Sequence, residues 1–197
     1  MTRLRQWLDR VPRPVLFAFA GLIQVALIAA MVVDRASILR NGTEVTLQSR
    51  PVDPRDLLRG DYVVLGYDIA TVPAGALAGA PSAGSAIFVK LAPKPDGFHA
   101  AVSAHVAPVP LAPGEVLIRG RATNGTNCGN EGHHYCASLN VAYGLERYFV
   151  PEGEGRAIEQ ARNQSKVAVV AAVNASGRAA IKRLLIDGKA VYDEPSY

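Results

Sequence analysis

One apolar run dominates what this chain can fold into. The segment VLFAFAGLIQVALIAAMVV, residues 15–33, contains a single polar side chain, Gln24. As an α-helix it would be about 28 Å long, close to the roughly 30 Å hydrocarbon core of a bilayer. It exceeds the about 7–15 apolar residues of a cleaved signal peptide, and no A-x-A-like cleavage site follows before Asp34. The sequence therefore predicts an uncleaved signal-anchor that crosses the lipid bilayer.

The charges flanking this run predict its orientation. The tail at 1–14 carries four arginines against one aspartate, whereas residues 34–40 are nearly neutral. Because positive charge accumulates on the cytoplasmic side, the tail should be cytoplasmic and the rest of the chain exported. We expect a linker at 34–42 and an exported domain at 43–197. The tail accounts for most of the formal net charge of +4, so nucleic-acid binding has no support.

The region after the run has the pattern of a mainly β domain. Short apolar stretches rich in Val, Ile and Tyr alternate with Gly/Pro breaks, which favours an antiparallel β barrel or sandwich. They lie at 44–48, 61–69, 86–91, 98–106, 115–122, 135–143, 147–150, 166–173, 179–187 and 189–192. Hairpin turns are predicted at 174–178 and at Asp187-Gly188, a short helix at 155–163, and a surface loop at 71–84.

The two cysteines, Cys128 and Cys136, lie in the segment CGNEGHHYC. In an exported domain they would most simply form a disulfide across a Gly-rich loop. A metal or redox site with His133 and His134 is an alternative, although C-x7-C is not a usual zinc spacing. Free thiols are a third possibility, and no cofactor is predicted.

Two further groups of polar residues are candidates for a site. His99 and His105 lie six apart on one predicted strand and would share a face, but no third metal ligand is evident. The segment PVDPRDLLRGDY is stiffened by two prolines and alternates in charge. It is either a self-paired surface turn or a binding loop, whose candidate residues are Asp53, Arg55, Asp56, Arg59, Asp61 and Tyr62.

The stretch GDYVVLGY, residues 60–67, resembles the defining pattern of the GDYXXLXY family of membrane-anchored bacterial proteins. The matching positions are Gly60, Asp61, Tyr62, Leu65 and Tyr67. The flanking PVDPRDLLR and the later GLERYFVPEGEG are also similar to that family. The resemblance implies an inner-membrane location and an exported, mostly β domain, without an established activity.

Strand periodicity suggests what the motif does. Alternate residues of a strand lie on opposite faces, so Val63, Leu65, Tyr67 and Ile69 should face the core and Tyr62 the other way. Asp61 is expected to accept a hydrogen bond from backbone or from a tyrosine hydroxyl. On this interpretation the motif residues mainly stabilise the fold.

A partial resemblance to the β fold of type I signal peptidases rests on the order of DPRDLLRGDYVVL and AIKRLLIDGKAVYD. It places Lys182 at the position of the catalytic base, which would take the proton from a serine. The nucleophile position falls at Pro51 or Val52, where no hydroxyl exists, and Ser49 lies nearby but out of register.

Three hypotheses of function follow. The first is a noncatalytic domain anchored in the inner membrane, facing the periplasm and binding a protein or another envelope component. The family resemblance implies small integral membrane proteins as partners. The second is an envelope hydrolase that uses Ser49 and Lys182, or a carboxylate pair. The third is a metal or redox site at Cys128–Cys136.

Overall fold

The computed structural model describes residues 12–51, 62–123, 138–149 and 155–195. The chain divides into two compact units, Met1–Ser37 and Ile38–Tyr197. The first unit contains most of the helix α2 (Arg13–Asn41). The second unit is the mainly β domain that the sequence predicts.

Helix α2 is, within the described ranges, the one helix long and apolar enough to cross a membrane. Its most apolar 18-residue window has a mean hydropathy of 2.5, and none of that window is buried. The segment 34–42 that the sequence predicts as a linker is helical as far as Asn41. Residues 34–41 contain good helix formers and neither Gly nor Pro, so nothing ends the helix before Gly42.

The last turn of α2 belongs to the domain unit. Ile38 and Leu39 are buried there with Ala172 and Ala180. A Cβ atom at Gly42 would lie 2.5 Å from the Ile38 carbonyl oxygen and 2.9 Å from the Val173 nitrogen. Only glycine therefore fits where the chain passes from the helix into the first strand.

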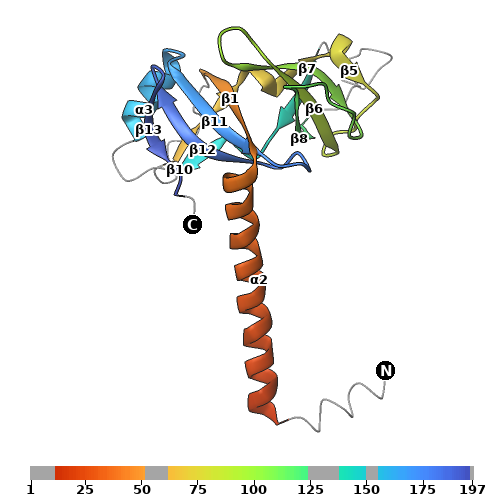
Figure 1. Ribbon diagram of the computed structural model, residues 1–197, viewed down its shortest axis with the longest axis vertical. Coiled ribbons are helices and arrows are strands. Elements are labelled where there is room, and N and C mark those ends of the chain that lie inside the picture. The colour runs from red at the N-terminus through yellow and green to blue at the C-terminus, as the bar shows by residue number, and fades with distance from the viewer. Residues whose placement is uncertain (1–11, 52–61, 124–137, 150–154, 196–197) are drawn as a thin grey trace. The chain divides into compact units, whose positions relative to one another are not determined.

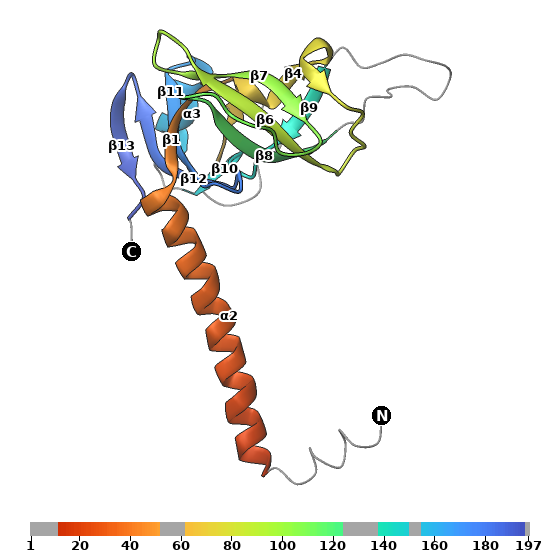
Figure 2. The same ribbon diagram turned by 45° about the vertical axis from the view of Figure 1, so that its right-hand side comes forward.

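Three sheets make up the domain and wrap into a nearly closed, barrel-like structure (Figures 1 and 2). The five-stranded sheet has the order β13 (Lys189–Asp193), β12 (Ala179–Ile186), β11 (Val167–Val173), β1 (Thr43–Arg50) and β3 (Gly66–Tyr67). The six-stranded sheet has the order β4 (Thr71–Pro73), β9 (Ser138–Ala142), β8 (Val116–Ala122), β6 (Ala86–Pro93), β7 (His99–His105) and β5 (Leu77–Ala78). The pair β10 (Arg147–Phe149) and β2 (Tyr62–Val64) forms the third. All these pairings are antiparallel except that of β5 with β7.

The mainly β fold class is thus confirmed, and the helix predicted at 155–163 is α3 (Gly155–Asn163). Both predicted hairpin turns are also present. Gly177 has φ 80°, and Asp187 and Gly188 have φ 49° and 77°. These positive values lie in the left-handed region that Gly and Asp accept most readily.

Two segments differ from their predictions. The segment 71–84 is not simply a surface loop, since it contains β4, the 3₁₀ helix η2 (Ala74–Ala76) and β5. Val72 is fully buried and pairs with Leu139, so its burial outweighs the surrounding Pro and Gly. The segment 61–69 is not one continuous strand, because the ladder is interrupted at Leu65 and the 3₁₀ helix η1 begins at Asp68.

The barrel has a seam along one edge of β1. This strand pairs with β11 along most of its length, but with β3 only at Ser49 and Arg50. On its way past β7, the Thr46 backbone N–H donates to Nδ1 of His99 at 3.2 Å. A side chain thus satisfies a backbone donor that no described strand pairs.

Candidate functional site

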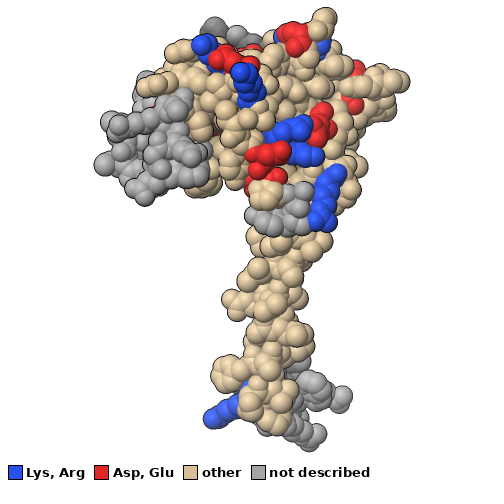
Figure 3. All heavy atoms as spheres, turned by 60° about the vertical axis from the view of Figure 1, so that its left-hand side comes forward, with Lys and Arg blue, Asp and Glu red and all other residues tan. Residues whose placement is uncertain are grey.

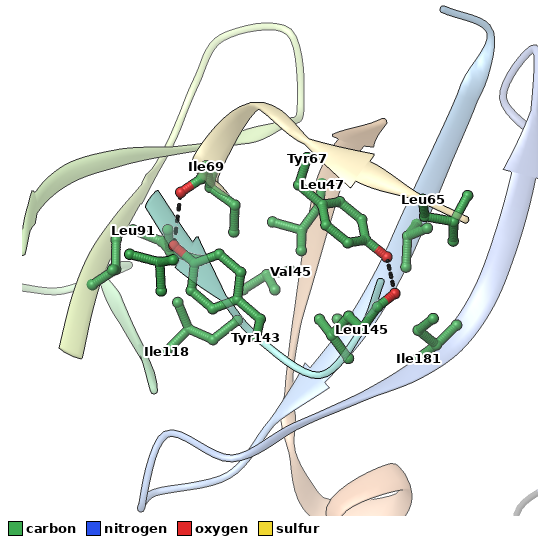
Figure 4. Close-up of a cluster of buried hydrophobic side chains, with 14 of the residues drawn as sticks. Val45, Leu47, Leu65, Tyr67, Ile69, Leu91, Ile118, Tyr143, Leu145 and Ile181 are labelled. Atoms are coloured by element: carbon green, nitrogen blue, oxygen red, sulfur yellow. Dashed lines mark hydrogen bonds between the residues drawn. The ribbon is translucent and has the colours of Figure 1, made fainter. Parts of the chain in front are cut away.

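The best-defined site around the family motif is a buried cluster in which two tyrosines cross-link two distant segments. The Tyr67 hydroxyl donates to the Leu145 carbonyl oxygen at 2.7 Å, and the Tyr143 hydroxyl donates to the Ile69 carbonyl oxygen at 2.7 Å (Figure 4). We call these four residues the tyrosine clasp. It joins the motif segment to the segment GLERYF, so the two stretches that carry the family resemblance are packed together.

Backbone and side-chain bonds extend the clasp. The Leu65 N–H donates to the Glu146 carbonyl oxygen at 2.8 Å, which continues the β2–β10 ladder past its end. The Glu146 carboxylate accepts from the backbone N–H groups of Tyr143 and Gly144. This carboxylate therefore fixes the tight turn that presents the Tyr143 side chain and the Leu145 carbonyl to the motif.

Burial sets the electrostatics of the clasp. Tyr67 is fully buried and Tyr143 is 7% exposed. Burial, and secondarily the nearby Glu146 charge, raises the pKa of Tyr67 and of Tyr143 above the usual value of 10.0. Both hydroxyls are therefore protonated hydrogen-bond donors at neutral pH, and neither is activated as a nucleophile or base.

The core assignment from strand periodicity is confirmed. Val63, Leu65, Tyr67 and Ile69 are all at most 2% exposed. Tyr67 thus serves the interior of the barrel, as its position in the alternation predicts. The described side chains of the motif, apart from Val64 and Gly66, therefore lie in the core.

A buried cation lies beside the same strand. Arg162 of α3 is 0% exposed, and its Nη1 donates to the Val64 carbonyl oxygen at 2.6 Å. Its Nε and Nη2 atoms donate to Oδ1 of Asn163 at 3.2 and 3.0 Å. No carboxylate of a described residue forms an ion pair with it. The guanidinium therefore fastens α3 to the motif strand through neutral acceptors.

Ser49 and Lys182, the candidates for a Ser/Lys dyad, are not brought together. Ser49 is fully buried on the core face of β1, and its Oγ forms no hydrogen bond with a described residue. Lys182 instead bonds Glu44 on the opposite face of β1, with Nζ 2.9 Å from Oε1. Ser49 lies five positions after Glu44, which is about 17 Å along a strand. The two side chains therefore cannot exchange a proton in this fold.

A β-bulge explains the partners of Glu44. Ile181 pairs with Ala171 and Arg183 with Val170, which leaves Lys182 as the extra residue of β12. Consecutive residues at a bulge can turn to the same side, and both Lys182 and Arg183 reach the Glu44 carboxylate. The hydrogen bond from Lys182 is the main reason that the pKa of Glu44 is lowered. Figure 3 shows one side of the domain, on which acidic and basic side chains touch one another at the surface.

The two strand histidines have separate partners. His99 accepts the Thr46 N–H, whereas Nε2 of His105 lies 2.8 Å from Oγ of Ser103. A bulge at Val102 lies between them and breaks the alternation on which their shared face was predicted. Burial lowers the pKa of His99. Among the described residues, no group of three His, Cys, Asp or Glu side chains could hold a metal ion.

Several predicted site residues lie outside the described residues. These are Asp53, Arg55, Asp56, Arg59, Gly60, Asp61, Cys128, His133, His134 and Cys136, together with the side chain of Tyr62. The predictions made for them, including the disulfide and the hydrogen bond from Asp61, therefore stay predictions.

Sequence reasoning missed Arg162, Tyr143 and Glu146. Arg162 lies four residues after the buried Ile158, so it falls on the inward face of α3. The i, i+4 spacing from Ile158 could have predicted that the Arg162 side chain is buried. The role of Tyr143 depends on a hydrogen bond to a residue more than 70 positions away. The role of Glu146 depends on the local turn that its carboxylate stabilises.

Together these features define a mainly β, barrel-like protein with one N-terminal candidate membrane helix. A family model described as GDYXXLXY protein matches residues 24–184. The chain belongs to the GDYXXLXY family, as the motif at 60–67 predicts. No curated protein and no solved structure matches the chain.

Proposed function

We propose that this protein is a single-pass inner-membrane protein whose domain at 43–197 faces the periplasm and binds an integral membrane protein without catalysis. The observation that carries the proposal is α2. Its most apolar window is fully unburied in the chain, and its last turn is part of the domain core. The arginines of the tail at 1–14 support a cytoplasmic N-terminus.

Chain length supports a partner in the same membrane. The apolar run ends at Val33, and the domain unit begins at Ile38. Five steps along a chain span at most about 18 Å even when fully extended. The domain is therefore tethered within reach of other proteins' membrane-proximal surfaces.

The role of the described polar residues supports binding over hydrolysis. Tyr67 and Tyr143 are used as buried structural donors, and Lys182 is paired with Glu44. The peptidase hypothesis needs Ser49 and Lys182 in contact, whereas Lys182 pairs with Glu44 on the face of β1 opposite to Ser49. The charged segment at 53–61 remains the candidate binding loop from its sequence.

Two experiments test the proposal. Alkaline phosphatase fused after residue 195 should be active, whereas a green fluorescent protein fused there should not fluoresce if exported unfolded. The opposite pattern would refute the periplasmic orientation.

The binding role is tested by crosslinking in intact cells followed by purification of the full-length protein. The double variant Arg55→Ala/Asp56→Ala should capture at least about fivefold less of a membrane protein than the wild type. The control is Lys94→Ala/Asp96→Ala, which removes an exposed ion pair on the β6–β7 turn. Equal capture by both variants, with equal thermal stability, would contradict the assignment of the binding loop.

A further inference from the structure

The only polar side chain of the apolar run remains unexplained by the proposed anchor. Gln24 is at the centre of residues 15–33, with nine apolar or small residues on each side. It is exposed on α2, and its amide forms no hydrogen bond with a described residue.

The depth of Gln24 makes this isolation unfavourable. About 14 Å of helix lies on either side of it, so in a bilayer its amide lies near the midplane. Lipid chains offer neither donors nor acceptors, whereas the amide has two N–H donors and one carbonyl acceptor. A single amide inside a transmembrane helix therefore favours contact with another polar group at the same depth.

The residues next to Gln24 on its helical face allow such a contact. Ala20 and Gly21 lie four and three residues earlier, one turn away on the same side. Both are exposed, and a Cβ atom placed at Gly21 would meet nothing within 4 Å. Bulkier apolar residues, Ile28 and Met31, continue the face in the other direction. Small residues beside a polar one let two helix backbones approach closely enough for a side-chain hydrogen bond.

We propose that this face, Ala20, Gly21, Gln24, Ile28 and Met31, pairs with the same face of a second copy of the chain. The inference rests on the proposed membrane anchor. Every copy inserts with the same orientation, so a parallel pair brings Gln24 to Gln24 at the same depth. An amide is its own complement, because the carbonyl of one copy accepts from the amino group of the other. A twofold arrangement thus satisfies both copies with one residue.

The test uses two differently tagged full-length copies expressed together, with one tag used for purification from mild detergent. Wild-type copies should co-purify, and copies mixed only after solubilisation should not. Gln24→Leu should lower co-purification at least about fivefold, Ala20→Leu should also lower it, and Gln24→Asn should restore most of it. The matched control is Ala26→Leu, a similar enlargement on the opposite side of the helix, which should leave co-purification unchanged.

Resistance to carbonate extraction separates the two proposals. A protein that stays in the membrane but does not self-associate overturns the pairing and leaves the anchor intact. Release of the wild-type protein by carbonate refutes the anchor itself. Unchanged co-purification of Gln24→Leu also overturns the pairing, as does a Gln24-dependent complex that contains a different membrane protein and one copy of this chain.

Discussion

Removal of the Tyr67 hydroxyl provides the sharpest test of whether the family motif is structural. The hydroxyl donates to the Leu145 carbonyl oxygen in a fully buried position. Tyr67→Phe keeps the ring and leaves that carbonyl without its donor. A buried polar group deprived of its partner costs about 1–3 kcal/mol. For a domain of this size, 2 kcal/mol corresponds to a fall in Tm of roughly 4–8 °C.

The matched control is Tyr148→Phe. Tyr148 is also buried, at 5% exposed, but its hydroxyl forms no hydrogen bond of normal geometry with a described residue, although the Tyr192 side chain packs edge-on against its ring. The same chemical change should therefore leave stability within about 0.5 kcal/mol or raise it slightly. The comparison isolates the hydrogen bond from the loss of an oxygen atom.

The assay is thermal unfolding of the full-length protein in detergent, followed by near-ultraviolet circular dichroism. Tyr143→Phe should behave like Tyr67→Phe, and the double variant should show a coupling of at least about 0.5 kcal/mol, because both bonds tie the same two segments. If Tyr67→Phe loses no more stability than Tyr148→Phe, the structural interpretation of the motif is wrong. That result combined with lost partner capture would assign the motif to binding.

Four further predictions follow from the described contacts. Ser49→Ala should be neutral or stabilising in thermal unfolding, because the buried Oγ forms no hydrogen bond with a described residue; a loss of stability above about 1 kcal/mol would contradict this. Arg162→Ala should cost about 3 kcal/mol or more by urea titration, through lost packing and an unsatisfied Val64 carbonyl; a cost below about 1 kcal/mol contradicts its role. Because the pKa values of Tyr67 and Tyr143 are raised in the folded state, the free energy of unfolding should be constant below pH 10 and fall above it, by up to about 1.4 kcal/mol per pH unit for each tyrosine. A free energy of unfolding that does not change above pH 10 would refute this. Glu44→Gln should cost under about 1 kcal/mol, since Glu44 is 40% exposed, and the difference should vanish in high salt and as pH falls below the usual Glu pKa of 4.5.

Local patterns in the sequence predicted what depends on local physics. Alternation placed Val63, Leu65 and Tyr67 in the core, and α3 begins and ends at the predicted residues. The turn at Asp187-Gly188 followed from the backbone freedom of those two residues. The apolar run predicted the candidate membrane helix α2.

Features set by distant contacts were not predictable from periodicity. The bulges at Val102 and Lys182 each insert one residue into a strand and so break the alternation on which face assignments rest. Val72 belongs to a strand because Leu139 lies beside it, despite its Pro- and Gly-rich surroundings. The acceptor for Tyr67 lies 78 residues away. No spacing rule connects such positions without the fold.

The pairing of β1 with β11 has a consequence for biosynthesis. Val45 is made early, yet its partner Ala171 follows about 126 residues later. At about 5–20 residues per second, β1 waits roughly 6–25 s before the strand that completes its ladder has been synthesised. During that interval residues 43–48 of the first strand lack the partner with which they pair in the folded domain. The domain can close only when its last fifth is present, so a truncated or stalled chain would expose an aggregation-prone strand and become a substrate for cellular quality control.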